Sequence, residues 1–168
     1  MDANLIFDIG AHRGEDTEFY LRKGFRVIGV EANPALYEGL RQKFKTFIAD
    51  GRLKVVNKAI SWAAGIVKFY VNKDVTEWGT FDPEWWNGID ERAPKVGRLK
   101  SRPSPPPIYS VNSACRNYVK IDIEGYDTIV LESFAEISER PEYVSIESDK
   151  GFVPGNSTRD SVADVPRI

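Results

Sequence analysis

The first sixty residues divide into short apolar runs separated by segments of mixed polarity. The runs Asn4–Ile9, Arg26–Val30 and Leu53–Ile60 have the length and β-branched content of buried strands. Between the first two runs, Glu15–Lys23 places acids in its first turn and bases in its last, an order that favours a helix. A second helix is predicted to start at Pro34, and its apolar positions trace one face: Leu36, Leu40, Phe44, Phe47 and Ile48. This alternation predicts an α/β fold in which helices flank a mainly parallel sheet.

The pattern becomes irregular in the second half of the chain. Gly65–Val71 alternates with a period of two and predicts an antiparallel strand, whereas 72–117 has neither helical nor strand periodicity. Strand patterns return at Tyr118–Ile123 and Tyr143–Ile146, with a helical pattern between them. After Pro154 the chain has few apolar residues, which is typical of a frayed end. We therefore expect one domain over 1–154, with an irregular insertion at about 72–117, and a tail at 155–168.

Composition excludes several classes of protein. Of 168 residues 42% are hydrophobic and 29% charged, and the net charge is −2, so no overall positive field attracts nucleic acid or an anionic membrane. One basic run, residues 92–102, is expected to be a solvated loop. No apolar run approaches the length of about 20 residues that a membrane span needs. The single cysteine, Cys115, excludes an internal disulfide framework and suits a reducing compartment, so the expected location is the cytoplasm.

Acid and amide side chains stand at the predicted carboxyl end of nearly every strand. They are Asp8, Glu31, Asn57, Asp122, Glu124 and Glu147. In open parallel sheets, ligands bind beyond these ends, at the point where the strand order reverses. Buried carboxylates are costly without partners, so this recurrence indicates a ligand site, although helix caps and surface positions would also explain some of them.

The turn after the first strand, "GAHRG", separates two kinds of ligand. The nicotinamide fingerprint G-x-G-x-x-G needs a glycine where this chain has His12, and Glu15 and Asp16 at the helix start would repel a pyrophosphate. S-adenosylmethionine (SAM) instead carries a positive sulfonium, a positive amine and two ribose hydroxyls. Asp8 suits the positive end of SAM and Glu31 its ribose. A glycine in this turn is expected to let the ligand approach the backbone.

Four stretches together resemble the FkbM-type SAM-dependent methyltransferases. They are "FDIGAHRGEDTEFYLRKGFRVIGVEANP", "VVNKAIS", "YVKIDIEGYD" and "YVSIES", and the similarity runs from about residue 4 to 150. The pairing of D-I-G-A-x-x-G with K-I-D-I-E-G is specific, whereas either motif alone is weak. The resemblance implies a Rossmann-like methyltransferase fold, SAM as the cofactor, and O-methylation of a sugar or another small metabolite.

The resemblance also implies which residues contact the cofactor. The methionine side of SAM is assigned to the glycine turn and its flanks, the ribose to the end of the second strand, and adenine to the neighbourhood of the Asn57–Ala59 turn. In chain order these residues are Asp8, Gly10, Ala11, Gly14, Glu31, Ala32, Asn33, Asn57 and Ala59.

A hydroxyl acceptor must lose its proton, so a carboxylate near the methyl group is the expected general base. The resemblance places Asp122 and Glu124 there, and Asp122 is the first choice. Trp78 and Thr80, in the irregular segment, are tentative acceptor contacts, although the tryptophans of this segment would equally serve to pack it onto the sheet. Lys120 is expected to be solvated or to cover a helix. Nothing in the spacing of the acids requires a metal ion.

Two features depart from the family pattern. No helical periodicity leads into "YVKIDIEG", and no further helix and strand pair follows "YVSIES", so the fold is expected to be shortened at its C-terminus. Such a chain exposes a sheet edge and can lack part of the acceptor pocket. Three functions therefore stay open: an active O-methyltransferase, a shortened inactive module that at most binds SAM, and a different α/β nucleotide enzyme. The sequence identifies neither the acceptor nor the oligomeric state.

Overall fold

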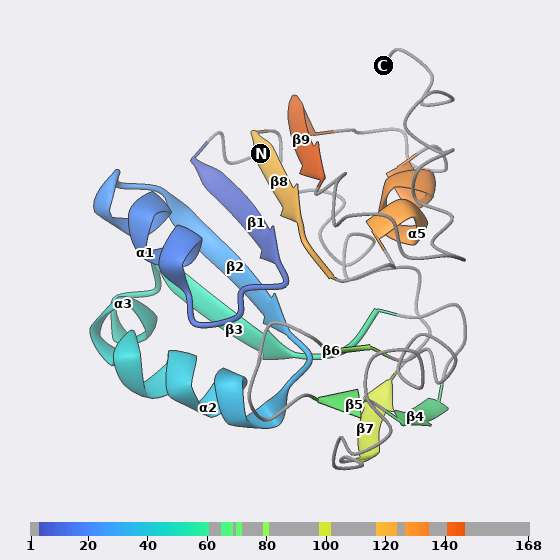
Figure 1. Ribbon diagram of the computed structural model, residues 1–168. Helices are drawn as coiled ribbons and strands as arrows, with labels where there is room; N and C mark the ends of the chain where they lie inside the picture. The colour runs from blue at the N-terminus through green and yellow to red at the C-terminus, as the bar shows by residue number, and fades with distance from the viewer. Residues whose placement is uncertain are drawn as a thin grey trace.

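A five-stranded parallel sheet forms the centre of the computed structural model (Figure 1). The structure describes residues 4–60, 65–68, 70–71, 79–80, 98–101, 117–123, 127–134 and 141–146. The strands of the sheet are β1 (Leu5–Ile9), β2 (Arg26–Glu31), β3 (Leu53–Asn57), β8 (Tyr118–Ile121) and β9 (Tyr143–Ile146). Their order is β3-β2-β1-β8-β9, and every neighbouring pair is parallel. The predicted α/β class is confirmed, and the strand order reverses between β1 and β8.

Helices lie on both faces of this sheet. One face carries α1 (Glu15–Arg22), α2 (Pro34–Lys43) and α3 (Lys45–Ala49), and the other carries α5 (Asp127–Ser133) (Figure 1). None of the helices in the described part of the chain is long and apolar enough to cross a membrane.

The predicted single helix that begins at Pro34 is wrong in one respect. Phe44, with φ −108° and ψ 23°, ends α2 and precedes α3. The apolar face nevertheless continues across the break, because the N–H of Phe44 donates to the carbonyl of Leu40 and the N–H of Ile48 donates to that of Phe44. Sequence periodicity therefore identified the buried face correctly but did not reveal the break in helical backbone at Phe44.

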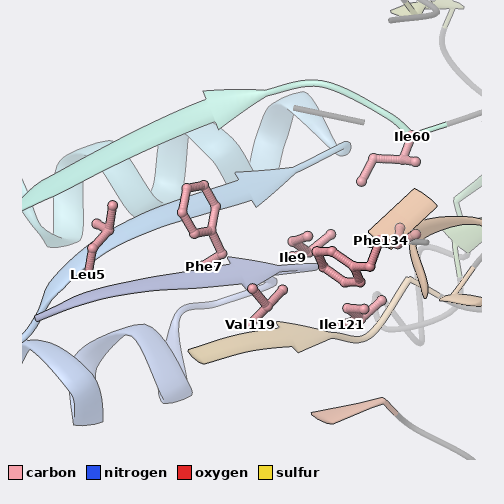
Figure 2. Packing of buried hydrophobic residues seen from close by; sticks show 8 residues of the cluster. Leu5, Phe7, Ile9, Ile60, Val119, Ile121 and Phe134 are labelled. Atoms are coloured by element: carbon pink, nitrogen blue, oxygen red, sulfur yellow. The ribbon is translucent and has the colours of Figure 1, made fainter. Parts of the chain in front are cut away.

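Two apolar clusters hold the layers together. On the α5 side, alternate residues of β1 and β8 pack against that helix, and Figure 2 shows Phe134 beside Ile9 and Ile121. The members of this cluster are Leu5, Phe7, Ile9, Ile60, Val119, Ile121, Val130 and Phe134. The cluster on the α1 and α2 side consists of Ala11, Leu21, Val27, Leu40, Phe44 and Leu53. Because side chains alternate along a strand, the residues between the first set, among them Asp8 and Lys120, face α1.

Four short strands lie outside the main sheet. They are β4 (Gly65–Lys68), β5 (Tyr70–Val71), β6 (Gly79–Thr80) and β7 (Arg98–Ser101). The pairs β4–β7 and β5–β6 are both antiparallel. The prediction of one antiparallel strand over 65–71 is thus corrected to two strands that pair with different partners.

The predictions of an irregular segment and of a solvated basic loop were also wrong in part. Residues 79–80 and 98–101 form strands because each finds a partner in the segment before it, which no local periodicity reveals. The predicted tail at 155–168 lies outside the described residues. Within the described part, β9 is an edge strand of the sheet.

Candidate functional site

The glycine turn spans the gap between the ends of β1, β2 and β8. The N–H groups of Gly10 and Ala11 both donate to the carbonyl of Val30, at 2.9 and 3.0 Å. Gly10 has φ +87°, and a Cβ atom added to it would overlap the carbonyl oxygen of Asp122. The backbone that comes close to Gly10 is therefore the chain's own, where β8 ends. The structure gives Gly10 a packing role, and its role toward a ligand stays a prediction.

Gly14, at the other end of the turn, also permits a close contact that a side chain would block. It lies immediately before α1 with φ +77°, and a Cβ there would come within 2.5 Å of the Phe44 ring and 2.7 Å of the Leu40 side chain. Both side chains are buried, so they have little room to move. Gly10 thus lets the turn after β1 approach the end of β8, and Gly14 lets the start of α1 approach the C-terminal end of α2.

The carboxylate of Glu31 is held at the end of β2 by two backbone N–H groups. His12 donates to Oε2 at 2.8 Å, and Asn33 donates to Oε1 at 2.7 Å. Only 7% of Glu31 is exposed, and this burial raises its pKa to about 7 although the two N–H donors act to lower it. Each oxygen keeps acceptor capacity beyond the backbone donor, since a carboxylate oxygen has two lone pairs.

His12 occupies the position at which a dinucleotide fingerprint has its middle glycine. Its φ is +48°, the left-handed region that a side chain disfavours. In this conformation the backbone N–H of His12 donates its hydrogen bond to the Glu31 carboxylate. The backbone of the turn is therefore used to orient an acid.

The two asparagines predicted at the cofactor site act on the same turn. The Asn33 side chain accepts a hydrogen bond from the N–H of Ala35 at 2.9 Å and so caps α2, as its place before Pro34 predicts. The amide nitrogen of Asn57 donates to the carbonyls of Glu31 and Ala32, at 2.8 and 3.0 Å. Asn57 thereby ties the end of β3 to the turn that carries Glu31.

Asp8 is the most deeply buried acid of the site. None of its surface is exposed, and Thr17 donates its hydroxyl hydrogen to Oδ2 at 2.5 Å. The other oxygen, Oδ1, accepts no hydrogen bond from any described residue, and Lys120 Nζ lies 3.8 Å from it. Burial raises the pKa of Asp8 to about 6, against the opposing effect of Lys120.

Lys120 joins three carboxylates on the α1 face of the sheet. Its ammonium nitrogen lies 2.8 Å from Asp16 Oδ2, 3.4 Å from Asp122 Oδ2 and 3.8 Å from Asp8 Oδ1. Burial disfavours the charged form of Lys120, but the three acids outweigh burial and raise its pKa. The expectation that Lys120 is solvated or covers a helix was therefore wrong, because Asp8 and Lys120 are register partners on adjacent strands.

Three residues belong to this site although the sequence did not predict them there: Lys120, Asp16 and Thr17. A signal was present: "FDI" and "VKI" each set one charged residue between apolar neighbours, and the two charges have opposite signs. Pairing them requires knowing that β1 and β8 are adjacent and in which register. Neither fact can be read from the two runs separately.

Most of the predicted cofactor residues meet around the switch point of the sheet. Asp8, Gly10, Ala11 and Gly14 lie at the end of β1 and in the turn, beside Glu31, Ala32 and Asn33 after β2; Asn57 ends β3, and Ala59 follows it and is buried. Asp122 follows β8 directly, and its N–H donates to the carbonyl of Ile9 at 2.9 Å. Thr80 is on β6, which pairs with β5 outside the main sheet, whereas Glu124 and Trp78 are outside the described residues.

Comparison with known proteins points to one family. The model of the family described as methyltransferase FkbM domain matches residues 8–157. Among solved structures, the chain is similar to methyltransferase FkbM from Methylobacillus flagellatus KT, with 18% identity and a TM-score of 0.48 over 88% of this chain and 33% of that one. It is also similar to the MccD protein, with 16% identity and a TM-score of 0.30 over 39% and 31% of the two chains. The chain therefore spans about a third of the length of these structures, and no curated protein matches it.

Proposed function

The chain belongs to the FkbM methyltransferase family, and on this premise we propose that it transfers the methyl group of SAM to a hydroxyl oxygen of a sugar or another small metabolite. The observation that carries the proposal is the Glu31 carboxylate, which two backbone N–H groups orient at the end of β2 beside the switch point. An acid held in this way can accept two vicinal hydroxyl groups, as a ribose presents them.

The chemistry of the other residues fits SAM better than a dinucleotide. Asp8 carries a buried oxygen that accepts no hydrogen bond from the part of the chain that the structure describes, and a positive group is stabilised beside such an oxygen. The start of α1 carries Glu15 and Asp16, which disfavour a pyrophosphate at the helix N-terminus. When bound, SAM supplies a methyl group activated by its sulfonium.

The cofactor residues act mainly through position. We assign the ribose to Glu31 with the Ala32–Asn33 turn, the methionine end to Asp8 and the turn from Gly10 to Gly14, and adenine to the neighbourhood of Asn57 and Ala59. Asn57 contributes by holding the carbonyls of Glu31 and Ala32 rather than through its own amide hydrogens, which are engaged.

Asp122 is the proposed general base for the acceptor. It follows β8, next to the end of β1, and about a third of its side chain is exposed, so an acceptor from solvent has access to it. The acceptor oxygen would replace the sulfur of SAM on the methyl carbon, with S-adenosylhomocysteine as the leaving group, while Asp122 would take the hydroxyl proton and later return it to solvent. Glu124 is the second choice for this role, and Trp78 and Thr80 remain proposed acceptor contacts.

A second candidate is a module that binds SAM without transferring the methyl group. The observation that favours it is the ion pair between Asp122 and Lys120, because a carboxylate beside an ammonium is a weaker base.

Product formation separates the two candidates. The chain is incubated with SAM and a panel of sugars and hydroxylated small metabolites, and S-adenosylhomocysteine is measured by mass spectrometry. The proposal expects S-adenosylhomocysteine above the level without acceptor for at least one compound, with the excess lost in Asp122→Asn. Binding of SAM without product from any acceptor supports the module.

A further inference from the structure

Lys120 lies on the α1 face of the sheet and has no assigned role in the proposed methyl transfer. Lys120 is half-buried between β1, α1 and the end of β8, within 4 Å of a carboxylate oxygen from each. In the proposed function, Asp8 serves the cofactor and Asp122 serves the acceptor. Asp16, which is half exposed, is the closest of the three.

Lys120 itself is not a base at neutral pH. The three acids raise its pKa above the ordinary value, so its ammonium keeps its protons. A permanent positive charge at this position acts on its neighbours in two ways: it favours their ionised forms, and it fixes their side chains by attraction.

We infer that Lys120 is a positioning residue of the methyl-transfer site, which holds the Asp122 carboxylate toward the end of β1 and keeps Asp8 and Asp122 ionised together. This inference rests on the proposed function. Without the ammonium, Asp8, Asp16 and Asp122 remain as three acids around the position that the ammonium held, and their mutual repulsion favours protonation of Asp8, the most buried of the three.

Other charged or titratable groups also face this cluster. Glu31 and Tyr20 interact electrostatically with Asp8, and Tyr20 contacts Tyr118 at the start of β8 with 5.8 Å between ring centres. From β9, Ser145 stands opposite Lys120 and is uncharged. Within the described residues, Lys120 is therefore the only cation that is ion-paired with Asp8, and it is also ion-paired with Asp122.

The two neighbours of Asp8 are expected to act on it with opposite signs. The charge of Lys120 lowers the pKa of Asp8, whereas the charge of Asp16 raises it. Replacing Lys120 by methionine keeps most of the apolar stem and removes the charge, so Asp8 and Asp122 should titrate at higher pH. Replacing Asp16 by asparagine should move Asp8 to lower pH.

The test measures the titration midpoints of the Asp8 and Asp122 carboxyl groups by ¹³C NMR in the cofactor-free chain. The pH is varied from about 3 to about 9 in steps of roughly half a unit. Lys120→Met is expected to raise the midpoints of Asp8 and Asp122 by about one pH unit or more, Lys120→Arg to keep them near the wild-type values, and Asp16→Asn to lower that of Asp8. Lys54→Met is the matched control, because Lys54 is an exposed lysine on β3 of the same sheet.

Two results would overturn the inference. One is a Lys120→Met chain whose Asp8 and Asp122 midpoints match the wild type, and the other is an equal displacement in Lys54→Met. If Lys120→Met fails to fold, as circular dichroism would show, the absence of a downward displacement in Asp16→Asn contradicts the cluster instead.

A second readout keeps this inference apart from the proposed function. Calorimetry with S-adenosylhomocysteine at pH 6 and 8 is expected to show a larger loss of affinity at pH 6 in Lys120→Met than in Lys54→Met. A wild-type chain that binds no S-adenosylhomocysteine contradicts the proposed function, whereas the carboxyl titration still decides whether Lys120 sets the charge of its neighbours.

Discussion

Gly10 shows most clearly how single residues build the site. The space that its missing side chain leaves is filled by the carbonyl of Asp122, so the turn after β1 and the end of β8 meet at van der Waals distance. The proposed base is thus brought beside the glycine turn by a contact between two stretches of backbone.

This contact predicts an unequal effect of two alanine substitutions. Gly10→Ala combines a left-handed φ with overlap against Asp122 and should lower the free energy of unfolding by more than about 3 kcal/mol. Gly24→Ala has the same left-handed φ, at +92°, but no atom within 4 Å, and should cost only about 1 kcal/mol. Urea denaturation of both variants measures the difference, and similar losses would show that the overlap is relieved without cost.

Asp122 should affect turnover and leave cofactor affinity nearly unchanged. Asp122→Asn keeps the shape of the side chain and removes its ability to take a proton, so turnover should fall by roughly 10²-fold or more, with the dissociation constant for S-adenosylhomocysteine changed less than about threefold. Steady-state kinetics with an identified acceptor and calorimetry measure the two quantities. If affinity falls as far as in Glu31→Gln, Asp122 is a cofactor ligand and Glu124 becomes the candidate base.

At the scale of elements, the turn after β2 depends on β3. Asn57 donates from its side chain to the carbonyls of Glu31 and Ala32, and these bonds set the path of the chain between β2 and α2. The N–H of Asn33, which is part of this path, in turn holds Glu31. The orientation of the proposed ribose acid is therefore a property of three elements together.

Substitution of Asn57 tests this dependence. Asn57→Ala removes both donors and should weaken S-adenosylhomocysteine binding several-fold, with a stability loss of roughly 1–3 kcal/mol. Asn57→Asp should lower both the affinity for S-adenosylhomocysteine and the stability further than Asn57→Ala, because it places a carboxylate against two carbonyl oxygens. Calorimetry and thermal unfolding give the order, and wild-type affinity in Asn57→Asp would contradict the positioning role.

The strands and helices that carry the site could be predicted because their apolar pattern is local. Predicted strands overran β3 and β8 at their C-terminal ends, since Ile60 and Ile123 continue the apolar runs. Both pack on the core after the strand has ended. Pairing was harder to predict: β7 and β6 form only because β4 and β5 lie beside them, and the Lys120 cluster exists only because β1 and β8 are neighbours.

At the scale of the whole molecule, the sheet order brings two buried acids of raised pKa to one end of the fold. Asp8 and Glu31 titrate at about 6 and about 7, against ordinary values of 3.8 and 4.5. Between the ordinary pKa of each acid and its raised pKa in the native chain, the native chain holds a proton that the unfolded chain has lost. The free energy of unfolding must therefore fall as the pH rises through this range.

This linkage predicts a cofactor-free chain that is less stable at pH 7.5 than at pH 5. Full ionisation of each acid costs on the order of 3 kcal/mol of stability, so the combined difference should be at least roughly 2 kcal/mol. Urea denaturation at the two pH values measures it, with Glu31→Gln as the variant in which the difference should shrink. Equal or greater stability at pH 7.5 would show that the two acids are not buried as the structure has them.

We propose that SAM binds at the switch point between β1 and β8 through Glu31, and calorimetric titration with S-adenosylhomocysteine tests this binding. The wild-type chain should bind one equivalent and bind NAD more weakly. Glu31→Gln, in which an amide replaces a carboxylate that accepts charge-assisted hydrogen bonds, should lose about tenfold or more in affinity. NAD binding as tight as that of S-adenosylhomocysteine, or unchanged affinity in a folded Glu31→Gln chain, would contradict the account.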